Sequence, residues 1–144
     1  MVKKGANLNS EATHGSTPLR NAMQLSAKEN DKDIEIFKLL VDNGADFKCR
    51  CGNCCQANYL MFALNSGKTS IANYLIEKGI DLSQKNCNGY NALHFAVGNG
   101  NFEVTKILVE KGVDHKEKTN NGNTALDLAR KNKDLEIINY LEKL

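Results

Sequence analysis

The chain has 144 residues, of which 41% are hydrophobic and 25% are charged, and its formal net charge is +2. This composition is typical of one folded domain, and so small a charge excludes an electrostatic argument for a nucleic-acid or membrane partner. No apolar run approaches the roughly 20 residues that a membrane helix needs, and the first residues contain no apolar signal-peptide core.

The five cysteines indicate the redox compartment. Four of them, Cys49, Cys51, Cys54 and Cys55, lie within seven residues, and the fifth is Cys87. An odd number of cysteines with this crowding is a poor layout for a disulfide framework. We therefore expect a reducing, cytoplasmic location.

In chain order, the sequence predicts a single domain over 1–144 that is built from repeats. Residues 1–9, which contain Gly5-Ala6-Asn7, are interpreted as the tail of a preceding repeat. Four further segments follow: 13–48 with an insert of six residues, 49–83 with an irregular cysteine-rich loop, 84–116, and 117–144.

A recurring phrase sets the period of these segments. The phrases are Thr17-Pro18-Leu19, Asn58-Tyr59-Leu60, Asn91-Ala92-Leu93 and Thr124-Ala125-Leu126, and the last three begin at equal intervals along the chain. A fixed period of about 33 residues indicates a stacked repeat architecture.

The first segment departs from this period through an insert. The stretch from its phrase to its closing glycine, Thr17 to Gly44, is six residues longer than the stretch from Asn91 to Gly112. The difference locates the insert, and we expect Lys28 to Asp33 to form a polar loop inside it.

Each segment predicts two helices. The first residue of the phrase is a good N-cap, and Pro18 lies where a helix tolerates proline best. A leucine and an alanine three residues later form an apolar stripe, as in Leu93 and Ala96. A second apolar helical stretch ends at the closing glycine, which supplies a left-handed residue. Asn88-Gly89 and Asn121-Gly122 predict tight turns before the third and fourth phrases.

These motifs resemble ankyrin repeats. Thr17-Pro18-Leu19 and Ala92-Leu93-His94-Phe95-Ala96 match the two halves of the family signature, and Gly44-Ala45-Asp46 matches the end of a unit. The resemblance implies an all-α fold, a solenoid of stacked antiparallel helix pairs with β-hairpin-like finger loops. It also implies that His94 is structural and bonds near the base of a finger.

The resemblance further implies a protein–protein interaction scaffold, with a groove formed by the fingers and the inner helices. The expected partner is another protein, and we expect no enzyme activity, no cofactor, and a monomeric chain. Tyr90 is the strongest single candidate, because tyrosine is enriched among interface hot spots. The predicted partner-binding residues are His14, Ser16, Gln24, Asn65, Asn88, Tyr90, Asn99, Asn121, Asn123 and Lys131, with Cys55, Ala57, Ser66 and Asn132 as further groove positions.

The cysteine cluster leaves an alternative function open. Four thiolates can hold zinc in a tetrahedral site, and Cys51 and Cys54 have the spacing of a zinc knuckle. Cys87 occupies the place on the next finger that Cys54 has on its own, and is a fifth candidate. The alternative is a metal- or redox-responsive module that uses Cys49, Cys51, Cys54 and Cys55. The competing interpretation is a set of reduced thiols on a variable loop.

Overall fold

The computed structural model describes residues 7–10, 17–25, 31–48 and 57–144. Helices in these ranges are α1 (Pro18–Leu25), α2 (Asp31–Asp42), α3 (Tyr59–Asn65), α4 (Thr69–Glu77), α5 (Ala92–Gly98), α6 (Phe102–Glu110), α7 (Ala125–Asn132) and α8 (Leu135–Glu142). Within the described part of the chain, no helix is long and apolar enough to cross a membrane. The predicted all-α stack of helix pairs is confirmed.

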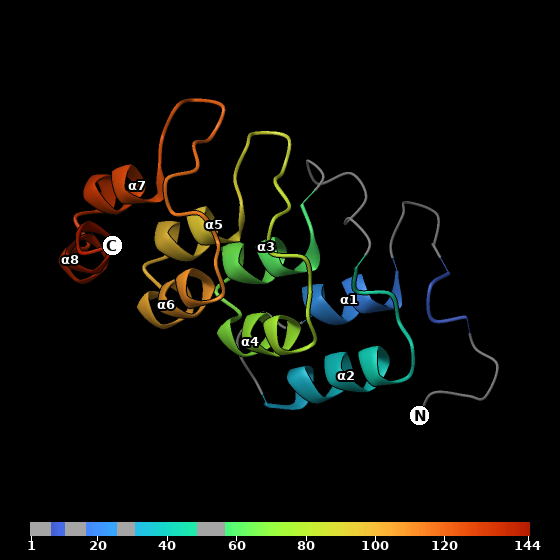
Figure 1. Cartoon of the computed structure of the whole chain (residues 1–144). Coiled ribbons are helices and arrows are strands. Elements are labelled where there is room, and N and C mark those ends of the chain that lie inside the picture. Colours follow the sequence, from blue (N-terminus) through green and yellow to red (C-terminus); the bar gives the residue numbers. More distant parts are fainter. Residues whose placement is uncertain (1–6, 11–16, 26–30, 49–56) are drawn as a thin grey trace.

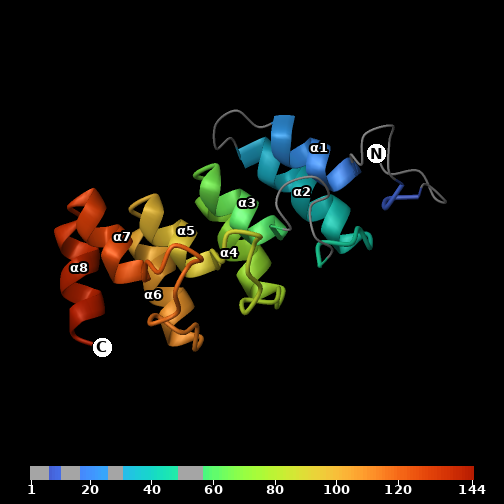
Figure 2. The same cartoon turned by 90° about the horizontal axis from the view of Figure 1, so that it is seen from above.

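The helices form two rows (Figure 1). The first row contains α1, α3, α5 and α7, and the second contains α2, α4, α6 and α8. Each helix of the first row packs against the next helix in the chain. Neighbouring units touch through the second row along the whole stack, and also through the first row from α3 to α7. Seen from above, the pairs follow one another along the stack, from α1 and α2 at one end to α7 and α8 at the other (Figure 2).

Side-chain caps begin the helices of the first row where the phrases predict them. The side chain of Asn58 accepts a hydrogen bond from the Met61 amide, and Asn91 and Thr124 do the same for the amides three residues on. Each cap satisfies an N–H that has no partner inside the helix. The equal spacing of the phrases therefore places three helix starts in register.

The closing glycines end the helices of the second row. Gly44, Gly79 and Gly112 have φ of +96°, +77° and +87°. After α4, the amide of Ile80 donates to the carbonyl of Leu75, and the Gly79 amide donates to that of Ile76. This is the Schellman arrangement, in which a left-handed residue turns the chain out of the helix. The chain then runs into the next finger.

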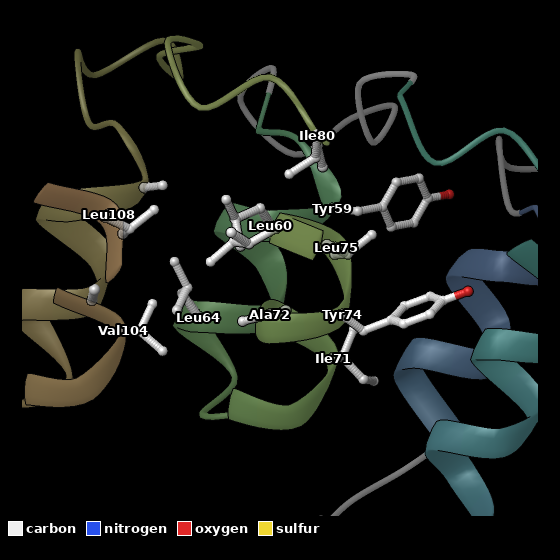
Figure 3. Packing of buried hydrophobic residues seen from close by; sticks show 14 of the residues in the cluster. Tyr59, Leu60, Leu64, Ile71, Ala72, Tyr74, Leu75, Ile80, Val104 and Leu108 are labelled. Atoms are coloured by element: carbon white, nitrogen blue, oxygen red, sulfur yellow. The ribbon is translucent and has the colours of Figure 1, made fainter. Parts of the chain in front are cut away.

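Burial of the leucine–alanine stripes joins the units. Leu60 and Leu93 are fully buried together with Ala63 and Ala96. Leu60 and Leu64 of α3 point toward Val104 and Leu108 of α6, whereas Ile71 and Tyr74 of α4 point toward α2 (Figure 3). The core is thus continuous across the layers rather than confined to each helix pair. Burying a leucine side chain stabilises a fold by about 1.5–3 kcal/mol, so each repeat of the stripe adds to the stability of the stack.

Two polar contacts made by largely buried side chains connect the first unit to the second. The fully buried ring of Tyr59 brings its hydroxyl to 2.8 Å from Oγ1 of Thr17, the residue before α1. Lys68 precedes α4 and makes no side-chain cap there. Its buried ammonium donates instead to the carbonyl of Met23, near the C-terminus of α1. A cation is favourable at that end of a helix.

The six-residue insert differs in part from the expectation. Helix α2 has 12 residues, whereas α4 and α6 have 9 each. The loop predicted over Lys28 to Asp33 is therefore wrong at its end, because α2 begins at Asp31. Three of the six inserted residues thus lengthen the helix.

Candidate protein-binding surface

Two fingers are described in full, over residues 84–91 and 117–124. In the first, the Asn86 amide donates to the Tyr90 carbonyl at 2.9 Å, and Thr119 and Asn123 repeat this bond at 2.9 Å in the second. Gly89 and Gly122 hold the turns with φ of +78° and +80°. The Asn-Gly turns predicted from the sequence are confirmed. Both fingers project from the same side of the stack (Figure 1).

The fingers are bonded to each other. The Asn120 amide donates to the Asn88 carbonyl at 3.0 Å, and the Asn120 side chain donates to the Cys87 carbonyl at 2.8 Å. The backbones approach so closely that a Cβ on Gly89 would lie 2.6 Å from Asn120 Oδ1. This contact fixes the spacing of the two fingers, and with it the position of Tyr90 at the base of the first.

His94 anchors the base of the first finger. It is 1% exposed, and its Nδ1 accepts from the Asn91 amide in a capping box. Its Nε2 lies 3.1 Å from the carbonyl oxygen of Glu117 in the next finger, to which an Nε2–H donates. Burial lowers the pKa of His94 below its ordinary value, which favours the neutral imidazole. The structural role expected for His94 agrees with this geometry.

In the last unit a carboxylate takes the place of the imidazole. Asp127 occupies the position in its unit that His94 has in the preceding one, and its Oδ2 accepts from the Thr124 amide at 2.9 Å. Hydrogen bonds from Thr124 lower the pKa of Asp127. The two caps share one geometry with different chemistry, so both hold a finger to its helix.

A shallow cleft lies on the exposed face of the inner helices. Its volume is about 270 Å³, and it runs from the end of α3 across α5 to α7. The Tyr90 ring packs against the rings of His94 and Phe95, with centroids 5.6 and 5.7 Å apart. The cleft is lined by Asn65, Tyr90, His94, Phe95, Gly98, Asn99, Leu128, Lys131 and Asn132.

Two asparagines of the cleft connect successive inner helices. The side-chain amide of Asn99 donates to the Leu64 carbonyl at the end of α3. That of Asn132 donates to the Gly98 carbonyl at the end of α5, at 3.0 Å. Their donors therefore satisfy helix-terminal carbonyls, which stabilises the stack and leaves less capacity for a partner.

The structure brings together four of the predicted partner-binding residues. Asn65, Tyr90, Asn99 and Lys131 line the same cleft, as does the further position Asn132. Asn88 and Asn121 are exposed on the fingers, Asn123 is partly buried, and Gln24 is exposed on α1, all outside this cleft. His14 and Ser16 lie outside the described residues. None of these roles is tested by the geometry, so they stay predictions.

Phe95 and Leu128 also belong to the cleft. From the sequence, Phe95 could lie either on the groove or between units, and Leu128 was not among the predicted residues. They occupy the same position in successive units, and both are partly buried. The repeat spacing gives the two residues equivalent positions on α5 and α7, and this equivalence was the sequence signal that could have placed both in the cleft. Their apolar character instead suggests the core, where each indeed packs in part.

The cysteine cluster Cys49, Cys51, Cys54 and Cys55 lies outside the described residues. Cys87 is exposed on the first described finger. Over the described ranges, no group of three or more histidine, cysteine or acidic residues is arranged to hold a metal ion. Zinc binding and redox response by the cluster therefore stay predictions.

Comparison with known proteins gives a family match along the chain. A family model of ankyrin repeats, in three copies, matches residues 1–86, 23–119 and 60–143. Among curated proteins, no match was found.

Proposed function

Because the chain belongs to the ankyrin repeat family, whose members generally mediate protein–protein interactions, we propose that it binds a partner protein through the concave face of its inner helices. The contact is centred on Tyr90 and the cleft beside it. The fingers form one wall of this surface, and the helices α3, α5 and α7 form its floor.

One observation carries the proposal: the aromatic side chain in the cleft is held in place by the residues packed around it. Tyr90 is partly buried against His94 and Phe95, so its ring has a fixed place and still faces the cleft. An ordered aromatic side chain loses little conformational entropy on binding and buries a large area. Interface hot spots have this character.

We propose no catalytic role for this surface. The family consists typically of non-enzymatic binding scaffolds. His94, the histidine that lines the cleft, is bonded through both ring nitrogens to backbone groups. A general base needs a reacting group within hydrogen-bond reach, and both nitrogens of this imidazole already have structural partners.

The test compares partner capture by the wild-type chain with capture by two variants of the cleft. Tyr90→Ala removes the aromatic anchor, and Leu128→Asp places a charge on the apolar floor. We expect either change to weaken binding of the captured protein by at least about tenfold, the loss typical of a hot spot.

Glu110→Ala provides the control, because Glu110 is exposed on α6 in the second row. It should leave binding unchanged. Circular dichroism and thermal unfolding of each variant verify that the helices persist. Capture that is equally strong for the wild type and both cleft variants would refute the proposed surface.

A further inference from the structure

The charge of the cleft is one-sided. Lys131 is exposed in the last turn of α7, and it is the charged side chain among the described residues that line the cleft. Ion pairs in the described part of the chain involve other residues, Lys78 with Asp42, Lys85 with Glu117 and Arg130 with Glu142. The neighbouring Arg130 thus has a carboxylate within the chain, whereas the ammonium of Lys131 has none there.

The remainder of the cleft is apolar or already hydrogen-bonded. Tyr90, Phe95 and Leu128 supply carbon surface, and the amide groups of Asn99 and Asn132 donate to helix-terminal carbonyls. A partner therefore gains from two kinds of contact. One is apolar burial, and the other is the attraction of a negative group to Lys131.

These two contacts are close together. Leu128 and Lys131 are three residues apart on α7, so they lie on the same face of the helix. Tyr90 and Phe95 border the same cleft from the finger and from α5. With about 270 Å³ the cleft is smaller than the pockets that enclose drug-sized ligands. It fits side chains of a peptide segment better than a whole small molecule.

We propose that the occupant is a partner segment that places one apolar side chain against Tyr90, Phe95 and Leu128 and a carboxylate beside Lys131. The inference rests on the proposed function and adds the chemistry of the partner. Charge complementarity selects an acidic segment over a basic one, and the aromatic floor selects an apolar residue within a few positions of the acid.

The experiment uses a display library of random peptides of about twelve residues, selected on the full chain and on three variants. The variants are Lys131→Glu, Tyr90→Ala and Lys143→Glu. Lys143 is a matched control, because it is exposed beyond the end of α8 and does not line the cleft. Both lysines lie near a helix C-terminus, so the two reversals disturb the helix dipole alike.

We expect peptides selected on the wild type to be enriched in Asp or Glu within about four residues of an aromatic or aliphatic residue. Selection on Lys131→Glu should shift the enrichment to Lys and Arg, and selection on Tyr90→Ala should lose the apolar position. Lys143→Glu should select the wild-type peptides. For one such peptide carrying a fluorophore, Lys131→Gln should raise the Kd roughly 2- to 5-fold, as expected for an exposed ion pair. Added salt should weaken wild-type binding more than that of the variant.

The outcomes separate the chemistry from the site. Peptides that need Tyr90 but show no acidic preference, and whose selection ignores Lys131→Glu, overturn this inference and leave the proposed function standing. A library that yields no peptide dependent on Tyr90 overturns both.

Discussion

Gly89 shows how one residue sets the distance between two fingers. Its φ is +78°, and a Cβ there would meet the Asn120 side chain at 2.6 Å and the Asn120 amide nitrogen at 2.8 Å. Gly122 has the same conformation, with φ of +80°, but nothing lies within 4 Å of its Cβ position. Comparing substitutions at these two glycines therefore separates the destabilisation caused by a left-handed backbone from that caused by a steric clash.

We predict that Gly89→Ala destabilises the chain by about 2–3 kcal/mol, because strain and clash add. Gly122→Ala should cost only about 1 kcal/mol, for the backbone conformation alone. Urea unfolding monitored by circular dichroism measures both. Equal losses for the two variants would show that the finger-to-finger contact does not persist in solution.

Burial of His94 should make the stability of the chain depend on pH. Burial lowers its pKa in the folded state, whereas in the unfolded chain the pKa is about 6.5. Between these two values the unfolded state binds more protons than the folded state, so the free energy of unfolding falls as the pH falls below about 6.5. Above that value both states hold a neutral imidazole and the contribution is constant.

The measurement is the free energy of unfolding between pH 7.5 and pH 5.5 for the wild type and for His94→Gln. The variant is expected to be less stable at neutral pH, because the bond to the Glu117 carbonyl is altered, but to depend less on pH across this window. Since the other histidines are present in both proteins, the difference reports on His94. Parallel pH profiles would contradict the buried, neutral imidazole.

At the scale of the elements, equivalent leucines of the stripe differ in burial between the middle and the end of the stack. Leu93 of α5 is fully buried between α3 and α7, whereas Leu126 of α7 is only partly buried and borders the outer end of the stack. The two residues occupy the same place in successive units, each the second residue after the start of its phrase. What differs is the number of neighbouring units that cover them.

We predict that Leu93→Ala lowers the free energy of unfolding by about 2–5 kcal/mol, the range for a fully buried leucine. Leu126→Ala should cost about 1–2 kcal/mol, because less area leaves water when it packs. Chemical denaturation of both variants gives the comparison. A larger loss at Leu126 than at Leu93 would mean that the outer end is covered in solution.

The starts of α3, α5 and α7 and the ends of α2, α4 and α6 were predictable from the sequence because their signals are local. Asn91 and Thr124 cap the helices that follow them, and Gly79 has the left-handed conformation that its position indicated. These features depend on a few adjacent residues, and the period of the chain repeats them. The two-row stack follows from the same period, since a single helix pair cannot bury its own apolar face.

The contacts between units were not predictable in the same way. Asn99 bonds the Leu64 carbonyl, and Asn120 bonds the Cys87 carbonyl, each across the length of about one unit. Such bonds depend on the rotation and distance of neighbouring units, which no local motif reports. The cleft is a consequence of this packing. Tyr90 could therefore be chosen from the sequence, whereas Phe95 could be placed either on the groove or in the core and Leu128 was not selected.

At the scale of the whole molecule, the first unit has an open apolar face. Ile36 and Leu39 of α2 are 52% and 47% exposed. Counted back from the closing glycines Gly44 and Gly79, their counterparts in the second unit are Ile71 and Tyr74, which are 2% and 9% exposed. In that unit the face is covered by α2 (Figure 3). In the described part of the chain no helix covers the same face of α2.

We predict that Ile36→Gln together with Leu39→Gln changes the free energy of unfolding by no more than about 0.5 kcal/mol, as is usual for exposed positions. Ile71→Gln should cost about 3 kcal/mol, because it removes buried apolar area and buries an amide. Sedimentation velocity over a range of concentrations tests whether a second copy binds the open face, because such binding would make the sedimentation coefficient rise with concentration. If the chain is a monomer, as expected, the sedimentation coefficient does not change with concentration and the double variant keeps the free energy of unfolding of the wild type. A costly double variant with a concentration-dependent coefficient would instead show that copies of the chain associate through α2.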